Sequence, residues 1–155
     1  MPTAMGSQSL IFMGSDSIAL PVLEAIREGR CGPGSIDAIY TQPDRPRGRG
    51  KKIDANEIKL WAKENEIPVF QPSKVGKEER LDIQAINPSV ILVMAYGHLL
   101  SHKLLDVPHR GVWNLHTSLL PKYRGASPIQ AALASGESAT GVSLMKVVRK
   151  MDAGP

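Results

Sequence analysis

The stretch Val90-Ile-Leu-Val-Met-Ala95 is an unbroken apolar run, preceded by Pro88-Ser89 and followed by Tyr96-Gly97. Uninterrupted apolar runs of this length are typical of strands that are buried on both faces of a parallel sheet. A transmembrane helix needs about 20 consecutive apolar residues, so this run is far too short to span a bilayer. The stretch therefore predicts a central strand of a parallel sheet.

Outward from this strand, apolar periodicity predicts alternating strands and helices. Further strands are expected at residues 10–13, 36–40, 69–70, 111–116 and 141–148. Helices are expected at residues 18–26, 56–64, 77–86 and 128–134, with a short helical turn at residues 101–105. Asn56 is expected to cap the second of these helices. The alternation is typical of a doubly wound α/β domain of Rossmann type with a mostly parallel sheet.

The composition is that of one ordinary globular domain. The chain has 155 residues, of which 42% are hydrophobic and 22% are charged. Its one cysteine, Cys31, excludes an internal disulfide and a cysteine-based zinc site, which suits a reducing cytoplasm. Residues 1–9 are interpreted as an N-terminal extension, because they lack the features of a signal or transit peptide. We expect a cytoplasmic protein, or one of an organellar matrix if the source is a eukaryote.

Residues 43–52, Pro-Asp-Arg-Pro-Arg-Gly-Arg-Gly-Lys-Lys, concentrate the positive charge of the chain. They contain five basic residues and one acid, so their net charge equals the +4 of the whole chain. Glycines and prolines without apolar periodicity predict a mobile loop. Two interpretations stay open, a solvated loop that favours solubility and a surface that binds nucleic-acid phosphates. No aromatic residue lies among the charges, so stacking on bases is not expected.

The stretch Asn114-Leu-His116 ends the strand that is expected at residues 111–116. Two residues apart on a strand, Asn114 and His116 point to the same face. Together with Asp152 they supply a carboxamide, an imidazole and a carboxylate, which are groups that stabilise an oxyanion and move protons at a carbonyl centre. The set indicates acyl-type transfer without a covalent enzyme intermediate. No set of residues makes a credible metal site.

Ligands of open parallel sheets bind beyond the carboxyl ends of the strands. Gly14-Ser-Asp16, Tyr96-Gly97, Asn114-Leu-His116 and Asp152 are therefore expected to converge on one edge. Structural interpretations stay open for each: a histidine at a strand end is more often structural, and Asp152 can belong to a turn. Gly14-Ser-Asp16 lacks the three-glycine nucleotide fingerprint, so it is a weak anion-binding signal. Three further histidines are interpreted as structural: His98, His102 and His109.

Several motifs together resemble those of the folate-dependent formyltransferases. They are Asn114-Leu-His116, Ser118-Leu-Leu-Pro121, Tyr123-Arg-Gly-Ala126, Pro128-Ile-Gln130 and Asp152-Ala-Gly154. Within that family, Thr41-Gln-Pro-Asp-Arg-Pro46 followed by Gly48-Arg-Gly-Lys-Lys52 resembles the methionyl-tRNA formyltransferases. The related purine-pathway formyltransferases share the Asn-x-His and Ser-Leu-Leu-Pro patterns but are not expected to carry the basic segment. The resemblance runs from about Leu10 to the last residue.

The resemblance implies transfer of a formyl group from 10-formyltetrahydrofolate to the α-amino group of methionyl initiator tRNA, in translation initiation and without a metal. It assigns catalysis to Asn114, His116 and Asp152. It assigns the folate site to Ser118, Leu119, Leu120 and Pro121, together with the backbone of Ala95, Tyr96 and Gly97. It assigns tRNA contact to Arg45, Arg47, Arg49, Lys51 and Lys52, the last three of them against the acceptor stem.

The resemblance also implies a domain organisation. Residues 10–155 are expected to be an N-terminal formyltransferase domain that is incomplete at its C-terminal end, with the family's C-terminal tRNA-binding β-barrel absent. Missing final strands are expected to expose a sheet edge. Two alternatives stay open, a formyltransferase that acts on a small amine or nucleotide substrate and a non-catalytic fragment that binds folate or RNA. No membrane partner is expected, and the oligomeric state is not indicated.

Overall fold

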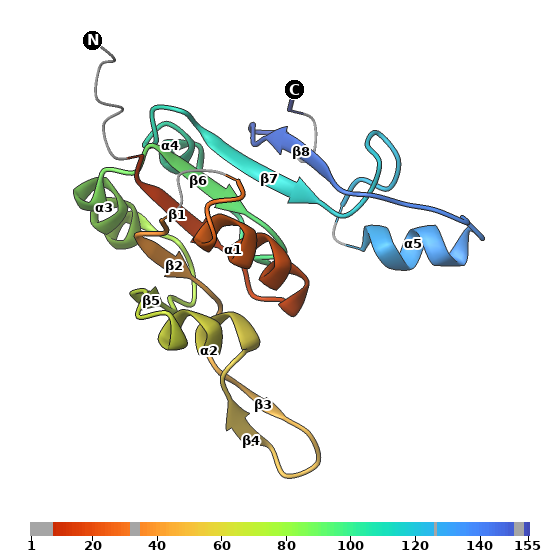
Figure 1. Ribbon diagram of the computed structural model, residues 1–155, viewed down its shortest axis with the longest axis horizontal. Helices are drawn as coiled ribbons and strands as arrows, with labels where there is room; N and C mark the ends of the chain where they lie inside the picture. The colour runs from red at the N-terminus through yellow and green to blue at the C-terminus, as the bar shows by residue number, and fades with distance from the viewer. Residues whose placement is uncertain (1–7, 32–34, 126, 151–153) are drawn as a thin grey trace.

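The computed structural model describes residues 8–31, 35–125, 127–150 and 154–155. Its centre is a six-stranded sheet in the order β5-β2-β1-β6-β7-β8 (Figure 1). The strands are β1 (Leu10–Met13), β2 (Ala38–Tyr40), β5 (Val69–Phe70), β6 (Val90–Val93), β7 (Val112–His116) and β8 (Ser143–Lys146). Neighbouring strands pair in parallel except β7 and β8, which are antiparallel. This is the doubly wound, mostly parallel sheet that the sequence predicts.

Helices cover both faces of the sheet. They are α1 (Leu20–Arg27), α2 (Glu57–Glu64), α3 (Lys77–Ile86), α4 (His102–Leu105) and α5 (Pro128–Ala134). Leu10 and Phe12 of β1 pack in one core with residues of α1 and α2, whereas Ile11 and Met13 pack in a second core with residues of α3 and α4. All four side chains of β1 are at most 4% exposed. β1 is therefore buried on both faces, whereas in β6, the strand predicted from the apolar run, only Ile91 is fully buried and the other three residues are half-buried.

The helix ends follow local capping rules. The side-chain oxygen of Asn56 accepts a hydrogen bond from Lys59 N at 2.9 Å, which confirms the predicted cap of α2. α3 has its predicted bounds and ends at Asn87, which is left-handed (φ 55°) and precedes Pro88. α1 starts two residues later than expected, because a 3₁₀ turn at Ser17–Ala19, capped by Asp16, precedes it.

The segment at residues 43–52 is part of a β-hairpin, so the prediction of a mobile loop is wrong. β3 (Arg45–Arg47) pairs antiparallel with β4 (Lys52–Asp54) around a turn at residues 48–51. Every residue of both strands is exposed, so the hairpin has no buried face. Its sequence therefore lacks the apolar periodicity from which strands are predicted. Gly48 (φ 70°) and Lys51 (φ 47°) provide the left-handed conformations of the turn. Figure 1 shows the hairpin projecting from the sheet beyond α2.

Strands β6 and β8 also differ from expectation. β6 ends at Val93 instead of residue 95, because the chain turns at Ala95, which has a φ of 51°. β8 is shorter than expected and runs antiparallel to β7, so its carboxyl end lies at the amino ends of the parallel strands. The expectation that the last strand ends at the same edge as the others is therefore wrong.

Gly14 follows β1 at a point where the backbones of β1 and β6 come close together. A Cβ added to Gly14 would lie 2.5 Å from Met94 O and 2.6 Å from the ring of Phe12. We expect Gly14→Ala to lower the free energy of unfolding by about 2 kcal/mol, as overpacking does. Urea denaturation followed by circular dichroism measures this change.

Gly50 provides the matched control, because nothing lies within 4 Å of a Cβ added there. Gly50→Ala should change the free energy of unfolding by less than about 0.5 kcal/mol. Equal losses in the two variants would contradict the role assigned to close backbone approach at Gly14.

Candidate active site

The carboxyl ends of three strands meet at one edge of the sheet. Met13 at the end of β1 pairs with Val93 at the end of β6, and Val93 pairs in turn with Asn114 in β7. Beyond the strands, Ser15 N donates a hydrogen bond to Ala95 O at 3.0 Å. The segments that follow β1 and β6 therefore lie next to the end of β7, as the sequence predicts for these three segments.

Asn114 and His116 lie on the same face of β7. Val112, two residues earlier, packs in the core formed with α3 and α4, whereas Leu115 packs on the opposite face of the sheet. His116 is 5% exposed, and its Nε2 lies 2.8 Å from the carbonyl oxygen of Tyr123. A carbonyl oxygen only accepts hydrogen bonds, so this contact requires a proton on Nε2. The Nε2 proton thus points to Tyr123 O, and this contact fixes the imidazole at the carboxyl end of β7.

The segment after β7 is fastened to the start of β8. Ser143 Oγ donates to Ser118 O at 2.7 Å and accepts from Leu120 N at 3.0 Å. Ser118 is fully buried, and the peptide bond between Leu120 and Pro121 is cis. These contacts give the segment that is predicted to line a folate site a fixed place beside His116.

Glu137, which follows α5, anchors the same loop from its other end. Its Oε1 accepts hydrogen bonds from Tyr123 OH at 2.9 Å and from Lys122 Nζ at 3.3 Å. The hydrogen bond from Tyr123, followed by that from Lys122, holds the pKa of Glu137 below its ordinary value. Tyr123 also supplies the carbonyl that contacts His116, so this anchor helps to fix the imidazole.

Two side chains hold the turn at residues 95–97, which is predicted to lie beside the folate. Ser15 Oγ donates to Tyr96 O at 3.2 Å, and Gln42 Nε2 donates to the same oxygen at 2.9 Å. Ser15 Oγ also accepts from Gln42 N at 3.0 Å. The sequence singles out Ser15 only within a weak anion-binding turn and gives Gln42 no role. The one available signal is that each follows closely after a strand of the parallel sheet.

A buried aromatic group lies around this turn. Tyr40 and Tyr96 are 1% and 2% exposed, and the ring of Tyr96 contacts His98 edge to face with 4.8 Å between the ring centres. Burial raises the pKa of Tyr40 to about 12 and also raises the pKa of Tyr96. Both phenols therefore stay neutral at physiological pH, and they serve the packing beneath the turn.

The basic side chains that are predicted to contact tRNA are all exposed on the hairpin or its turn: Arg45, Arg47, Arg49, Lys51 and Lys52. The single acid of the segment, Asp44, accepts hydrogen bonds from Lys59 Nζ and Gln71 Nε2, each at 2.7 Å. The bond from Lys59, followed by that from Gln71, lowers the pKa of Asp44. The hairpin, residues 45–54, carries five cations and one acid, Asp54, so it has a net positive charge whether or not Asp44 is paired.

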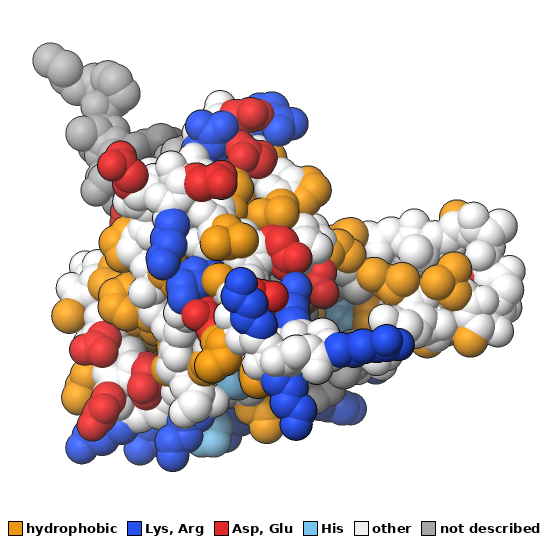
Figure 2. All heavy atoms as spheres, turned by 90° about the horizontal axis from the view of Figure 1, so that it is seen from below, with side chains coloured by type: hydrophobic (Ala, Val, Ile, Leu, Met, Phe, Trp, Pro, Cys, Tyr) orange, Lys and Arg blue, Asp and Glu red, His pale blue; other side chains and the backbone are white. Residues whose placement is uncertain are grey.

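Figure 2 views the molecule from the side toward which the hairpin points. Lys and Arg side chains lie across the centre of this view, and hydrophobic side chains gather on the arm that projects at the right. Figure 1 shows that this arm contains α5, which stands apart from the sheet. Exposed apolar side chains of α5 and its neighbouring loops are Leu119 (54%), Leu133 (72%) and Val142 (53%).

Asp152, the third predicted catalytic residue, lies outside the described residues. Its expected place at the common edge depends on a last strand that ends there, whereas β8 ends at the opposite edge. Within residues 8–31, 35–125, 127–150 and 154–155, no three His, Cys, Asp or Glu side chains are grouped to hold a metal ion. The helices in these same ranges include none with the length and apolarity needed to cross a membrane.

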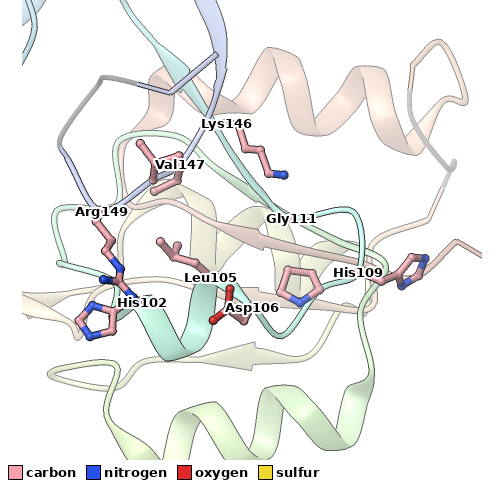
Figure 3. Close-up of a pocket in the computed structure, with 10 residues that line it drawn as sticks. His102, Leu105, Asp106, His109, Gly111, Lys146, Val147 and Arg149 are labelled. Carbon is pink, nitrogen blue, oxygen red and sulfur yellow. The ribbon is translucent and has the colours of Figure 1, made fainter.

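A separate pocket of about 430 Å³ lies at the amino end of β7 (Figure 3). Its lining comes from α4, the loop before β7 and the segment at the end of β8, and it includes His102, Asp106, Lys146 and Arg149. Among the described residues, none that is predicted to take part in catalysis, folate binding or tRNA binding lines it. The pocket is therefore distinct from the candidate active site.

Comparison with known proteins decides the family. Residues 8–155 match the family described as formyl transferase. The chain belongs to this family. It is 43% identical over 148 residues to a methionyl-tRNA formyltransferase of Thermotoga sp. (strain RQ2), covering 94% of this chain and 46% of that protein. It is 45% identical over 147 residues to the methionyl-tRNA formyltransferase of Methylococcus capsulatus, covering 94% of this chain and 47% of that protein. The chain thus spans about half the length of the curated relatives that it matches.

Solved structures support the same fold. A phosphoribosylglycinamide formyltransferase from Bacillus halodurans has a TM-score of 0.74 at 22% identity, covering 96% of this chain and 76% of that chain. A formyltetrahydrofolate deformylase from Pseudomonas syringae has a TM-score of 0.72 at 19% identity, covering 98% of this chain and 49% of that chain. At these identities the likeness shows the fold alone.

Tyr123→Phe removes the hydrogen bond that contributes most to the low pKa of Glu137. We expect the pKa of Glu137 to rise toward its ordinary value, and to rise more than in Lys122→Met, which removes the second contribution. NMR titration of the Glu137 carboxyl carbon measures both changes. A rise in Lys122→Met as large as that in Tyr123→Phe would contradict the assignment.

The sign of the pH effect follows from the depressed pKa. A carboxyl group whose pKa is lower in the folded state stabilises the fold above its unfolded pKa, and this contribution is lost as the pH falls through the folded pKa. The anchor of the loop should therefore weaken on acidification, and Tyr123→Phe should reduce this pH dependence.

Proposed function

We propose that this chain provides a formyl-transfer site that moves the formyl group of 10-formyltetrahydrofolate to the α-amino group of methionyl initiator tRNA, in translation initiation. The observation that carries the proposal is the placement of Asn114 and His116 on one face at the end of β7, next to the turn at residues 95–97. Relatives named methionyl-tRNA formyltransferase, 41–45% identical over nearly the whole chain, support the choice of acceptor.

The proposed chemistry needs hydrogen-bond donors at one oxygen. The neutral amine attacks the formyl carbon, and the carbonyl oxygen becomes a tetrahedral oxyanion. The Asn114 amide and a protonated His116 donate to this oxygen. As the bond between the formyl carbon and the folate N10 breaks, the proton of the attacking amine passes to that nitrogen. Asp152 is proposed to stabilise the imidazolium and to assist this proton transfer, on the resemblance of Asp152-Ala-Gly154 to the family motif and not on its placement, and the step calls for no metal.

The folate is proposed to lie between two fixed segments, residues 95–97 and residues 118–121. Leu119, which is 54% exposed, offers an apolar surface to a flat ring system. Ala95, Tyr96 and Gly97 offer backbone groups, held in place by Ser15 and Gln42. Fixed segments suit this task, because preorganised contacts lose little entropy when the ligand binds.

The tRNA is proposed to contact the basic hairpin through its phosphates. Its five exposed cations fit a binding mode in which affinity comes from the release of counterions. We further propose that residues 10–155 are a catalytic domain of a cytoplasmic or organellar protein, with the tRNA and the folate as its partners.

A second candidate is formyl transfer to a small nucleotide acceptor. The motifs Asn114-Leu-His116 and Ser118-Leu-Leu-Pro121, which resemble those of the purine-pathway formyltransferases as well, favour it. Formyl transfer from 10-formyltetrahydrofolate to methionyl initiator tRNA, glycinamide ribonucleotide and free methionine separates the two. Transfer to the charged tRNA supports the proposal, transfer only to a small acceptor replaces it, and no transfer to any acceptor contradicts activity of this chain.

We expect His116→Ala and Asn114→Ala each to slow formyl transfer by about 100-fold or more, because each removes a donor to the oxyanion. Single-turnover rates with saturating substrates measure this loss. His109→Ala is the control, because His109 is exposed and lines the pocket at the other edge of the sheet. Unchanged rates in both site variants would refute the catalytic assignment.

We expect Arg49→Glu to raise the KM for the charged tRNA by about tenfold while the KM for the folate stays the same. The slope of log KM against log salt should also become shallower, since fewer counterions are released. Arg110→Glu makes the same charge change in an exposed residue before β7 and should leave both KM values unchanged. Insensitivity of the tRNA KM to Arg49→Glu would favour the small acceptor.

A further inference from the structure

A continuous series of hydrogen bonds joins the base of the basic hairpin to the turn at residues 95–97. It runs from Asn56, which follows the hairpin, through Thr41 and Ser15 to the carbonyl of Tyr96. Gln42, which precedes the hairpin, joins it at two points. The two proposed substrates would therefore contact opposite ends of one hydrogen-bonded series.

At the turn, the series stabilises a backbone conformation that is unfavourable by itself. Ala95 has a φ of 51°, in the left-handed region that residues with a Cβ rarely occupy. Ser15 N, Ser15 Oγ and Gln42 Nε2 donate to the carbonyls of Ala95 and Tyr96, at 2.9–3.2 Å. A Cβ added to Gly97 would lie 2.3 Å from Gln42 Nε2, so the Gln42 side chain packs directly on this turn. The turn thus depends on donors supplied by two other strand ends.

In the middle of the series, all the hydroxyl protons point the same way. Asn56 Nδ2 donates to Thr41 Oγ1 at 2.8 Å, and Thr41 Oγ1 donates to Ser15 Oγ at 3.4 Å. Ser15 Oγ donates its one proton onward to Tyr96 O. Thr41 is fully buried and Asn56 is 8% exposed, so water does not readily replace these bonds. Loss of the Asn56 donor therefore changes the hydrogen bond from Thr41 to Ser15, and through it the bond from Ser15 to Tyr96 O.

At the hairpin, both of its ends are attached to the same series. Asn56 accepts from Lys59 N at 2.9 Å as the cap of α2. Gln71 Nε2 donates both to Gln42 O at 3.2 Å and to Asp44 Oδ1 at 2.7 Å, and Asp44 accepts from Lys59 Nζ. A ligand that restrains the hairpin therefore also restrains Gln42, which precedes its first strand, and Asn56, which follows its second strand.

We propose that RNA contact on the hairpin and folate contact at residues 95–97 are energetically coupled through Thr41, which acts as a positioning residue. This inference rests on the proposed function. RNA that restrains the hairpin restrains Thr41 and Gln42, which hold the left-handed turn in the conformation that the folate meets. The second ligand then loses less conformational entropy on binding. By thermodynamic linkage each ligand tightens the binding of the other by the same factor.

The test is the dissociation constant of tetrahydrofolate, measured by calorimetry with and without saturating deacylated initiator tRNA. Deacylated tRNA has no acceptor amine, so no reaction takes place. In the wild-type chain we expect the tRNA to tighten tetrahydrofolate binding by about fivefold or more, the lower range of typical coupling. Thr41→Val keeps the side-chain shape but lacks the hydroxyl, and should reduce this factor to less than about twofold. Thr41→Ser keeps the hydroxyl and should retain the coupling factor of about fivefold or more.

Two further variants separate coupling from stability. Asn65→Ala removes a hydrogen bond of 2.9 Å from Asn65 Nδ2 to Trp61 O at the other end of α2, and should leave the factor unchanged. Asn56→Asp keeps the acceptor that caps α2 but loses the donor to Thr41, so it should abolish the coupling with little loss of stability. If Thr41→Val does not fold, Asn56→Asp still tests whether the coupling depends on the hydrogen bonds of Thr41.

The outcomes separate this inference from the function on which it rests. A wild-type chain that binds neither tetrahydrofolate nor tRNA refutes the proposed function. A wild-type chain that binds both without coupling overturns the inference alone. So does coupling that survives in both Thr41→Val and Asn56→Asp.

Discussion

The parallel pairing of β1, β6 and β7 sets the positions of Asn114, His116 and the turn at residues 95–97 in the candidate active site. Because Met13, Val93 and Asn114 lie in register, β1 and β6 end at the level of Asn114, and β7 continues for two more residues to His116. Beyond that level the backbone has no strand partner, so its polar groups need donors from elsewhere. Ser15 and Gln42 supply donors to the carbonyl of Tyr96, so the turn at residues 95–97 is a consequence of how the sheet ends.

Local signals in the sequence account for most of the fold and for part of the site. The apolar run at residues 90–95 predicts the central strand, Asn56 predicts the start of α2, and the spacing of Asn114 and His116 predicts their common face. In each case the cause lies within a few residues of the effect. An apolar run, a capping residue and a two-residue spacing can each be read from a short segment, so the sequence alone reveals them.

What the sequence does not reveal depends on contacts between distant residues. Ser15 and Tyr96 are 81 positions apart, and nothing in the composition near either one indicates their hydrogen bond. The hairpin has no buried face, so it lacks the alternation by which strands are recognised. The direction of β8 is equally hidden, since a strand has the same side-chain period whether it pairs in parallel or antiparallel fashion.

In the proposed function, the hairpin is what lets one reaction centre serve an acceptor as large as an RNA. Connections between a strand and the next helix are usually about 2–6 residues long, whereas the one from β2 to α2 runs from residue 41 to residue 56. The added length carries the basic side chains away from the sheet, and both of its ends return to the buried side chains of Thr41 and Asn56. In the proposed function, this long connection binds the acceptor while Asn114 and His116 carry out the transfer, so the choice of acceptor and the chemistry belong to different segments.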